Sequence, residues 1–102
     1  APDDADPPLA LAAVCRKLER AEESARYLET ARRLVKADAW YARACIESVA
    51  GNADAALDCL RHAAEDKEFD RAWAKRDPDL EWIRDDPRFK EIIDGNQVKD
   101  AK

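Results

Sequence analysis

The long interior of this chain lacks the residues that interrupt helices. Between Leu9 and Arg76 there is no proline, and Gly51 is the only glycine. In a helix interior these two residue types cost about 3 and about 1 kcal/mol relative to alanine. The interval is rich in Ala, Leu, Arg, Glu and Lys, and it has no run of Val, Ile and Thr alternating with polar residues. The sequence therefore predicts an all-α fold.

Length and charge restrict the class of protein. The chain has 102 residues, which predicts one domain with a core that needs no disulfide or metal ion. The net charge is −5, and no basic patch is interleaved with aromatic residues, so we expect neither nucleic acid nor an anionic membrane as a partner. No segment approaches the roughly 20 apolar residues of a membrane span.

The first residues and the cysteines favour a cytoplasmic protein. The opening sequence APDDADPP is acidic and has no apolar run, so it does not predict a signal peptide. Cys15, Cys45 and Cys59 form no Cys-x-x-Cys pair, and an odd number fits reduced thiols better than a disulfide framework. We interpret the cysteines as small packing residues.

The first half of the chain predicts one long helix or two shorter ones. Apolar residues recur at three- and four-residue spacing over residues 9–36, which is typical of amphipathic helices. No glycine or proline breaks this stretch, and the polar run Glu19–Ser24 is the only candidate turn. We favour two helices.

A helical hairpin is predicted next. The helix over residues 39–50 is expected to be capped by Asp38 and ended by Gly51, because glycine readily adopts the left-handed conformation at a helix end. Arg43 and Glu47 are four apart on this helix and are expected to pair. A second helix follows to about residue 64.

Short helices are predicted in the last third. The segment FDRAWAK is expected to place Phe69, Ala72 and Trp73 on one face of a helix that stops before Asp77-Pro78. One turn should then carry Leu80, Trp82 and Ile83, and a last helix should carry Phe89, Ile92 and Ile93 and end at Gly95. We expect residues 1–8 to form a disordered acidic lead and residues 96–102 to fray.

The stretch RDPDLEWIRDDPRF could hold a metal ion or start helices. Asp77-x-Asp79 is a fragment of a calcium loop, but the loop glycine and the final glutamate are missing. Asp77 and Asp86 each precede a proline, which is where an N-cap belongs. We interpret these acids as helix caps and solvated surface, not as metal ligands.

No catalytic, cofactor-binding or metal-binding residue is predicted. His62 is the only histidine, and we expect it to be exposed and idle. No glycine-rich loop that could cradle a phosphate is present. The sequence therefore predicts a protein that is not an enzyme and needs no cofactor.

The central hairpin resembles a tetratricopeptide repeat. The signature places of that family are filled by Trp40, Ala44, Gly51, Ala56, Leu60 and Ala63. The pair Ala44-Cys45 is similar to a common bacterial version, and DPDLEWIRDDPRFKEII looks like the segment that often closes such arrays. The resemblance covers residues 38–94. Arg43 and Glu47 depart from it by standing where the family has apolar residues, so that strip is expected at a repeat edge or in solvent.

A looser match extends the resemblance toward the N-terminus. It places Leu18 and Glu19 at a turn, and it sets Ser24, Ala25, Leu28 and Ala31 on the places of Ala56, Leu57, Leu60 and Ala63. The resemblance therefore implies about two repeats in a single domain at 9–95. Residues 9–37 would be a degenerate repeat, 38–67 the best repeat and 68–95 a capping segment.

The resemblance also implies a function. Repeats of this family bind partners on the concave face of their first helices, which here would include Ala13, Arg16, Lys17, Asp38, Tyr41, Cys45 and Ser48. Tyr41 is the best anchor, although Tyr41 and Cys45 could instead pack under the C-terminal third. We expect a scaffold module for a protein or peptide partner, existing as a monomer or weak homodimer. The alternative is a structural capping or self-association domain.

Overall fold

The computed structural model describes residues 6–95, and within them it contains helices and no strand. The elements are α1 (Asp6–Lys17), α2 (Ala21–Leu34), α3 (Trp40–Ala50), α4 (Ala53–Ala64), α5 (Arg71–Arg76), the 3-10 turn η1 (Pro78–Leu80) and α6 (Pro87–Asp94). The prediction of an all-α fold made of antiparallel hairpins followed by short helices is confirmed. None of the described helices is both long and apolar enough to cross a membrane.

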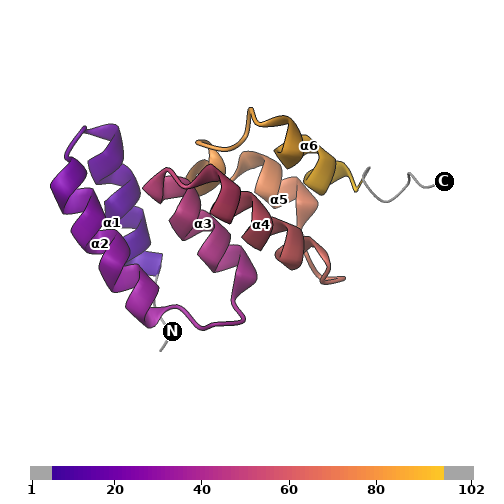
Figure 1. Ribbon diagram of the computed structural model, residues 1–102, viewed down its shortest axis with the longest axis horizontal. Coiled ribbons are helices and arrows are strands. Elements are labelled where there is room, and N and C mark those ends of the chain that lie inside the picture. Colours follow the sequence, from indigo (N-terminus) through magenta and orange to yellow (C-terminus); the bar gives the residue numbers. More distant parts are fainter. Residues whose placement is uncertain (1–5, 96–102) are drawn as a thin grey trace.

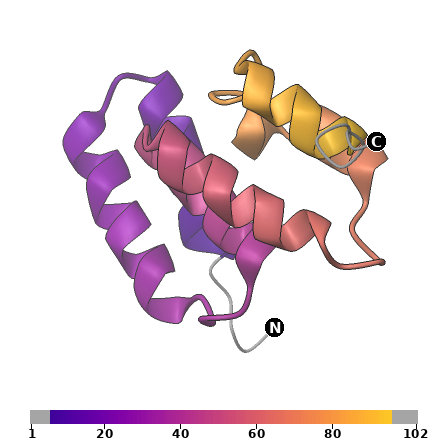
Figure 2. The same cartoon turned by 45° about the vertical axis from the view of Figure 1, so that its right-hand side comes forward.

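The hairpins lie side by side, and the short helices cover the far side of the second one. In Figure 1, α1 and α2 form one end of the molecule, α3 and α4 lie in the middle, and α5 and α6 form the other end. Figure 2 shows the same order after rotation. The middle hairpin therefore has neighbours on both sides, whereas the first hairpin has a neighbour on one side only.

The first hairpin turns through a residue in the left-handed conformation. Glu19 has φ 62°, and the Arg20 N–H bonds back to the Cys15 carbonyl at 2.8 Å. This bond spans the helix end in the manner of a Schellman motif. The prediction of two helices within residues 9–36 is confirmed, with the turn where the looser repeat match expects it.

The second hairpin turns in the same way. Gly51 has φ 88°, and the Asn52 N–H bonds back to the Glu47 carbonyl at 2.9 Å. Residues of the two hairpins correspond at an offset of 32 in residue number, so that Glu19 corresponds to Gly51. At the same offset, the bond from the Arg20 N–H to the Cys15 carbonyl corresponds to the bond from the Asn52 N–H to the Glu47 carbonyl. The same offset relates buried residues in four places, namely Ala12 to Ala44, Ser24 to Ala56, Leu28 to Leu60 and Ala31 to Ala63. The two hairpins are thus structural repeats of each other.

The starts of the first and third helices differ from the prediction. α1 begins at Asp6, inside the stretch 1–8 that was predicted as a disordered lead, and Pro7 and Pro8 lie in its first turn, where a missing N–H costs nothing. α3 begins at Trp40, and Asp38 does not cap it, because the turn before it closes through backbone groups such as the Asp38 carbonyl. The rest of the predicted lead, residues 1–5, and the predicted fraying of 96–102 lie outside the described residues.

The expected pairing of Arg43 with Glu47 is replaced by a contact between hairpins. Arg32 of α2 donates two hydrogen bonds to the Glu47 carboxylate at 3.1 and 3.2 Å, and Asn52 donates a third at 2.8 Å. Arg43 instead donates to the Ala37 carbonyl. The polar strip on α3 therefore lies at the edge between the two repeats.

The predicted face of α5 is wrong. Asp70 caps this helix by accepting from the Trp73 N–H at 2.9 Å, so α5 starts after Phe69. In this helix Ala74 is buried in the core, and Trp73 is exposed over 44% of its surface. The packing of α5 against η1 and α6, which the apolar spacing of the segment does not report, decides which side chain is buried here.

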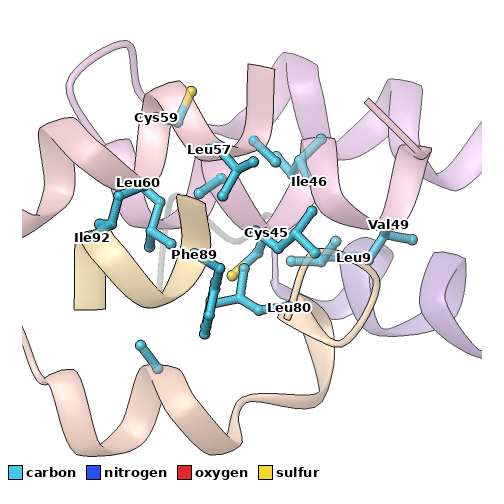
Figure 3. Close-up of a cluster of buried hydrophobic side chains, with 14 of the residues drawn as sticks. Leu9, Cys45, Ile46, Val49, Leu57, Cys59, Leu60, Leu80, Phe89 and Ile92 are labelled. Atoms are coloured by element: carbon cyan, nitrogen blue, oxygen red, sulfur yellow. The ribbon is translucent and has the colours of Figure 1, made fainter. Parts of the chain in front are cut away.

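The two Asp-Pro doublets do start helices. Asp77 accepts from the Asp79 N–H and Asp86 from the Arg88 N–H, each at 2.9 Å. These caps place Leu80, Ile83, Phe89, Ile92 and Ile93 in the core. In the close-up of Figure 3, Phe89 and Ile92 lie near Leu60, and Leu80 lies near Cys45. All three cysteines are buried, as expected of packing residues.

Candidate functional site

A pocket of about 380 Å³ opens where the start of α3, the end of α4 and the start of α5 meet. Four aromatic side chains line it, namely Trp40, Tyr41, Phe69 and Trp73. Four acidic residues also line it, namely Asp38, Asp66, Glu68 and Asp70. No lysine or arginine of the described chain is among the lining residues. We call this site the aromatic–acidic pocket.

Ring contacts hold the aromatic wall in place. Trp40 stacks on His62 with the ring centroids 4.2 Å apart, and Tyr41 meets Phe69 edge to face at 6.0 Å. Both arrangements are favourable for aromatic pairs. His62 is exposed as predicted, but it is not idle, because it supports Trp40. The wall is therefore formed before any ligand arrives.

Hydrogen bonds fix two of the four carboxylates. Asp66 accepts from the Glu68 N–H and Asp70 from the Trp73 N–H, each at 2.9 Å. Asp38 and Glu68 are exposed. None of the four forms an ion pair with a basic side chain of residues 6–95. The pocket lining thus carries four carboxylates that no ion pair of the described chain neutralises, although the guanidiniums of Arg43 and Arg71 lie against the Trp40 and Phe69 rings of its wall.

A buried hydrogen bond connects the pocket to the C-terminal segment. The Tyr41 hydroxyl donates to Asp77 Oδ2 at 2.6 Å, and the Cys45 Sγ lies 3.9 Å from the same oxygen. Burial, followed by this hydrogen bond to Asp77, raises the pKa of Tyr41 above its ordinary value, since both favour the protonated phenol. Asp77 caps η1 as predicted, and it is only 4% exposed, so among the acids of this stretch it does not belong to the solvated surface.

The same place gathers potential metal ligands. Three potential ligand atoms, one each from Cys45, Asp77 and Asp79, lie within 4.8 Å of one another. Both Asp77 oxygens already accept hydrogen bonds, one from the Tyr41 hydroxyl and one from the Asp79 N–H. The capping and the link to Tyr41 account for this cluster, and we base no metal site on it.

The predicted partner-binding residues do not form one surface. Asp38 and Tyr41 line the aromatic–acidic pocket. Cys45 and Ser48 are buried, out of reach of a partner, and Ala13 is half-buried against the core. The alternative reading, in which Tyr41 and Cys45 pack under the C-terminal third, describes their positions in the structure.

The two basic residues predicted to bind partners hold the fold together. Arg16 donates to the carbonyls of Ser48 and Val49 at 3.0 and 2.7 Å, at the end of α3, and its guanidinium lies 4.6 Å from the Trp82 ring. Lys17 pairs with Glu81 at 3.1 Å. Both side chains therefore connect α1 to later parts of the chain.

Sequence reasoning missed the lining residues between α4 and α5. Asp66 and Glu68 belong to a link between predicted helices, and Phe69, Asp70 and Trp73 belong to a predicted helix that was expected to pack through Phe69 and Trp73. The run DKEFD was the available signal, since it is mostly charged, holds one aromatic residue and lies near a connection between helices, where binding residues are common.

Comparisons of the chain with protein-family models, with curated proteins and with solved structures gave no match in any of the three. The chemistry of the site is therefore argued from its residues alone.

Proposed function

We propose that this chain is a small protein-interaction module of the tetratricopeptide-repeat type, which holds a segment of a partner protein in the aromatic–acidic pocket. The observation that carries the proposal is the preformed aromatic wall, open to solvent, at the junction of three helices. Tryptophan and tyrosine dominate the binding energy of many protein interfaces because they bury a large area at little entropic cost.

The chemistry of the lining residues favours binding over catalysis. The pocket has no Ser, Thr, Cys or Lys among its described lining residues, and the Tyr41 hydroxyl is engaged with Asp77, so its remaining nucleophilic groups are carboxylates and His62. Its one histidine is stacked on Trp40, and the Nδ1 atom lies 3.0 Å from the Asp58 carbonyl oxygen. A scaffold without a reaction of its own accounts for this set of residues.

Selection of peptides against the folded chain tests the proposal. Peptides from a displayed random library would be selected on the native protein and their affinities measured for Trp73→Ala. Trp73 is half exposed, so this change removes part of the wall and little of the core. We expect affinity to fall about tenfold or more, as for a central anchor.

A matched variant completes this test. Leu11→Ala removes a similarly exposed apolar side chain from α1, away from the pocket, and should leave the affinities unchanged. Selected peptides that bind Trp73→Ala as tightly as the native chain would overturn the proposal.

Self-association is a second candidate function, supported by an apolar face on α1. Leu11, Val14 and Leu18 are 47%, 53% and 59% exposed, and their spacing puts them on one side of the helix. The 32-residue offset carries Val14 onto Ile46, which is 1% exposed. The apolar position of Val14 is thus uncovered in the first hairpin and covered in the second, and two copies could meet through the exposed face around Val14.

Sedimentation over a wide concentration range tests this second candidate. Self-association through the α1 face predicts a mass that rises with concentration for the native chain and stays monomeric for Val14→Glu. The candidate is excluded if the native chain remains a strict monomer up to millimolar concentration.

A further inference from the structure

We propose that the aromatic–acidic pocket binds a lysine or arginine side chain of a basic peptide segment. This inference rests on the proposed function and names the chemistry of the partner.

The charge of the pocket selects a cation. Asp38, Asp66, Glu68 and Asp70 line it, and no described lysine or arginine does. A concave site with one sign of charge and apolar walls focuses its field and raises the local concentration of opposite charge. An acidic segment would be repelled, and a neutral one would gain nothing from the four carboxylates, none of which forms an ion pair in the described chain.

The aromatic wall selects an organic cation. The guanidinium of Arg43 lies 4.4 Å from the centroid of Trp40, and that of Arg71 lies 5.5 Å from the centroid of Phe69. Two rings of the wall therefore already bind cations from within the chain by cation–π contact. Trp73, the most exposed of the four, has no ring or cation partner of this kind within residues 6–95. The exposed indole of Trp73 is therefore the ring of the wall that is available to a cation of a partner.

The spacing of the acids argues against a metal ion as the ligand. In the described part of the chain, the one cluster with ligand atoms close enough to share an ion is Cys45, Asp77 and Asp79, and these residues lie outside the pocket lining. The pocket carboxylates are thus spread around the cavity. Spread acceptors suit an ammonium or guanidinium group, which carries three to five donors that point in different directions.

The size of the cavity fits one long side chain with its flanking backbone. The volume of about 380 Å³ is at the lower end of the range in which ligand pockets occur, roughly 300–1,000 Å³. A preformed pocket of this size loses little entropy when a single extended side chain enters it.

Titration with defined peptides, followed by NMR, tests the inference. The probes are capped Gly-Ser peptides of equal length that carry Lys, Arg, Gln or Glu at the same three central positions, added up to millimolar concentration. The readout is the set of indole N–H signals of Trp40, Trp73 and Trp82. Trp82 packs near Arg16 and does not line the pocket, so it serves as an internal control.

We expect the Lys and Arg peptides to shift the signals of Trp73 and Trp40 and to leave Trp82 unchanged. The Gln peptide should bind about tenfold more weakly, the Glu peptide should not bind, and added salt should weaken the Lys complex.

A pair of charge-neutralising variants separates the pocket from general attraction. Asp38→Asn with Glu68→Gln removes two lining charges, and neither side chain has a described hydrogen bond to lose. Glu22→Gln with Glu29→Gln removes the same charge from exposed positions on α2, outside the pocket. We expect the Lys peptide to lose about fivefold or more in affinity with the first pair and to be unaffected by the second.

The failures of the two proposals are distinguishable. If Gln or Glu peptides bind as well as Lys peptides, and Trp73→Ala abolishes binding while the pocket pair does not weaken it, the cation inference is wrong and the pocket still binds segments. If both variant pairs weaken binding equally and Trp82 shifts with Trp73, the attraction is nonspecific and the inference is wrong. If no peptide of the panel or of the selected library shifts Trp73, both proposals fail.

Discussion

The two hairpins have the same arrangement of turn and buried residues, and they differ in the elements that cover them. Each turns through a left-handed residue and buries the same four small or aliphatic positions, 32 residues apart. The second hairpin is covered by α1 and α2 on one side and by η1 and α6 on the other, whereas the first hairpin is covered on one side only (Figure 1). Two hairpins with the same pattern of turn and buried residues are thus covered to different extents. We expect the position of each hairpin in the stack to decide how much it contributes to stability.

The largest expected difference is at one pair of equivalent leucines. Leu28 and Leu60 occupy the same place in the two hairpins, and both are buried. Leu60 lies in the enclosed hairpin, near Ile92 of α6 (Figure 3). Leu60→Ala should lower the free energy of unfolding by about 2–5 kcal/mol, and Leu28→Ala by less, because the one-sided hairpin can relax around the cavity. Urea unfolding of both variants makes the comparison, and an equal or larger cost at Leu28 would contradict it.

A second difference arises where Tyr41 of the second hairpin corresponds to Leu9 of the first. Leu9 is buried and makes apolar contacts alone, whereas the Tyr41 hydroxyl donates to the buried Asp77 carboxylate. Tyr41→Phe removes this donor from a buried acceptor, and the free energy of unfolding should fall by about 1–3 kcal/mol. Tyr27→Phe on α2 is the control, since no hydrogen bond of that hydroxyl is found in the described chain, and its effect should be near zero. A Tyr41→Phe variant as stable as the native chain would show that the link to the C-terminal segment contributes little.

Helix starts at the two Asp-Pro doublets and helix ends at glycine follow from the sequence. Asp77 and Asp86 precede prolines and cap helices, and Gly51 and Gly95 end them. Because these features depend on only a few neighbouring residues, the local sequence pattern is enough to predict them. The hairpin plan also follows, because small residues at set places let two helices approach closely.

The parts that depend on distant residues do not follow. Glu47 pairs with Arg32 and not with Arg43, because the first hairpin brings the Arg32 guanidinium to it. Cys45 and Ser48 are buried because the C-terminal segment folds over α3. Of the pocket, only Asp38 and Tyr41 were among the predicted site residues, since the other acids come from a loop whose path is set by tertiary packing.

The turns give a third, smaller comparison. Gly51 adopts its positive φ without strain, but Glu19 does so with a side chain, which costs about 1–2 kcal/mol in the left-handed region. Gly51→Ala should destabilise by about that amount through backbone strain alone, because an added Cβ would meet only the Arg16 guanidinium at 3.9 Å. Glu19→Gly should stabilise by about 0.5–1 kcal/mol, the relief being partly offset by the freer unfolded chain. Thermal unfolding measures both, and a destabilised Glu19→Gly would mean that the two turns are not equivalent.

The smallest expected effect concerns a charge that only the second hairpin has. The offset carries Glu47 onto Cys15, which is buried and uncharged, so the first hairpin has no counterpart. Burial alone would raise the pKa of Glu47, but the hydrogen bonds from Arg32 and Asn52 and the nearby positive charges outweigh it and leave this pKa below its usual value of 4.5. A carboxyl whose pKa is lowered in the folded state stabilises the fold above its unfolded pKa, and this contribution disappears as the pH falls through the folded pKa.

Comparing the native chain with Glu47→Gln isolates this contribution. The difference in free energy of unfolding should be about 1 kcal/mol or less near neutral pH, since the pair is partly exposed, and it should shrink as the pH is lowered from about 4.5. Asp86, whose pKa is lowered mainly by hydrogen bonds from Arg88, titrates in both proteins and therefore cancels in the difference. For Glu29→Gln, at an exposed site on α2, the difference in free energy of unfolding from the native chain should not shrink at low pH in this way. If the difference in free energy of unfolding between the native chain and Glu47→Gln stays constant from neutral to acidic pH, the contact between the hairpins here depends on packing and not on the charge of Glu47.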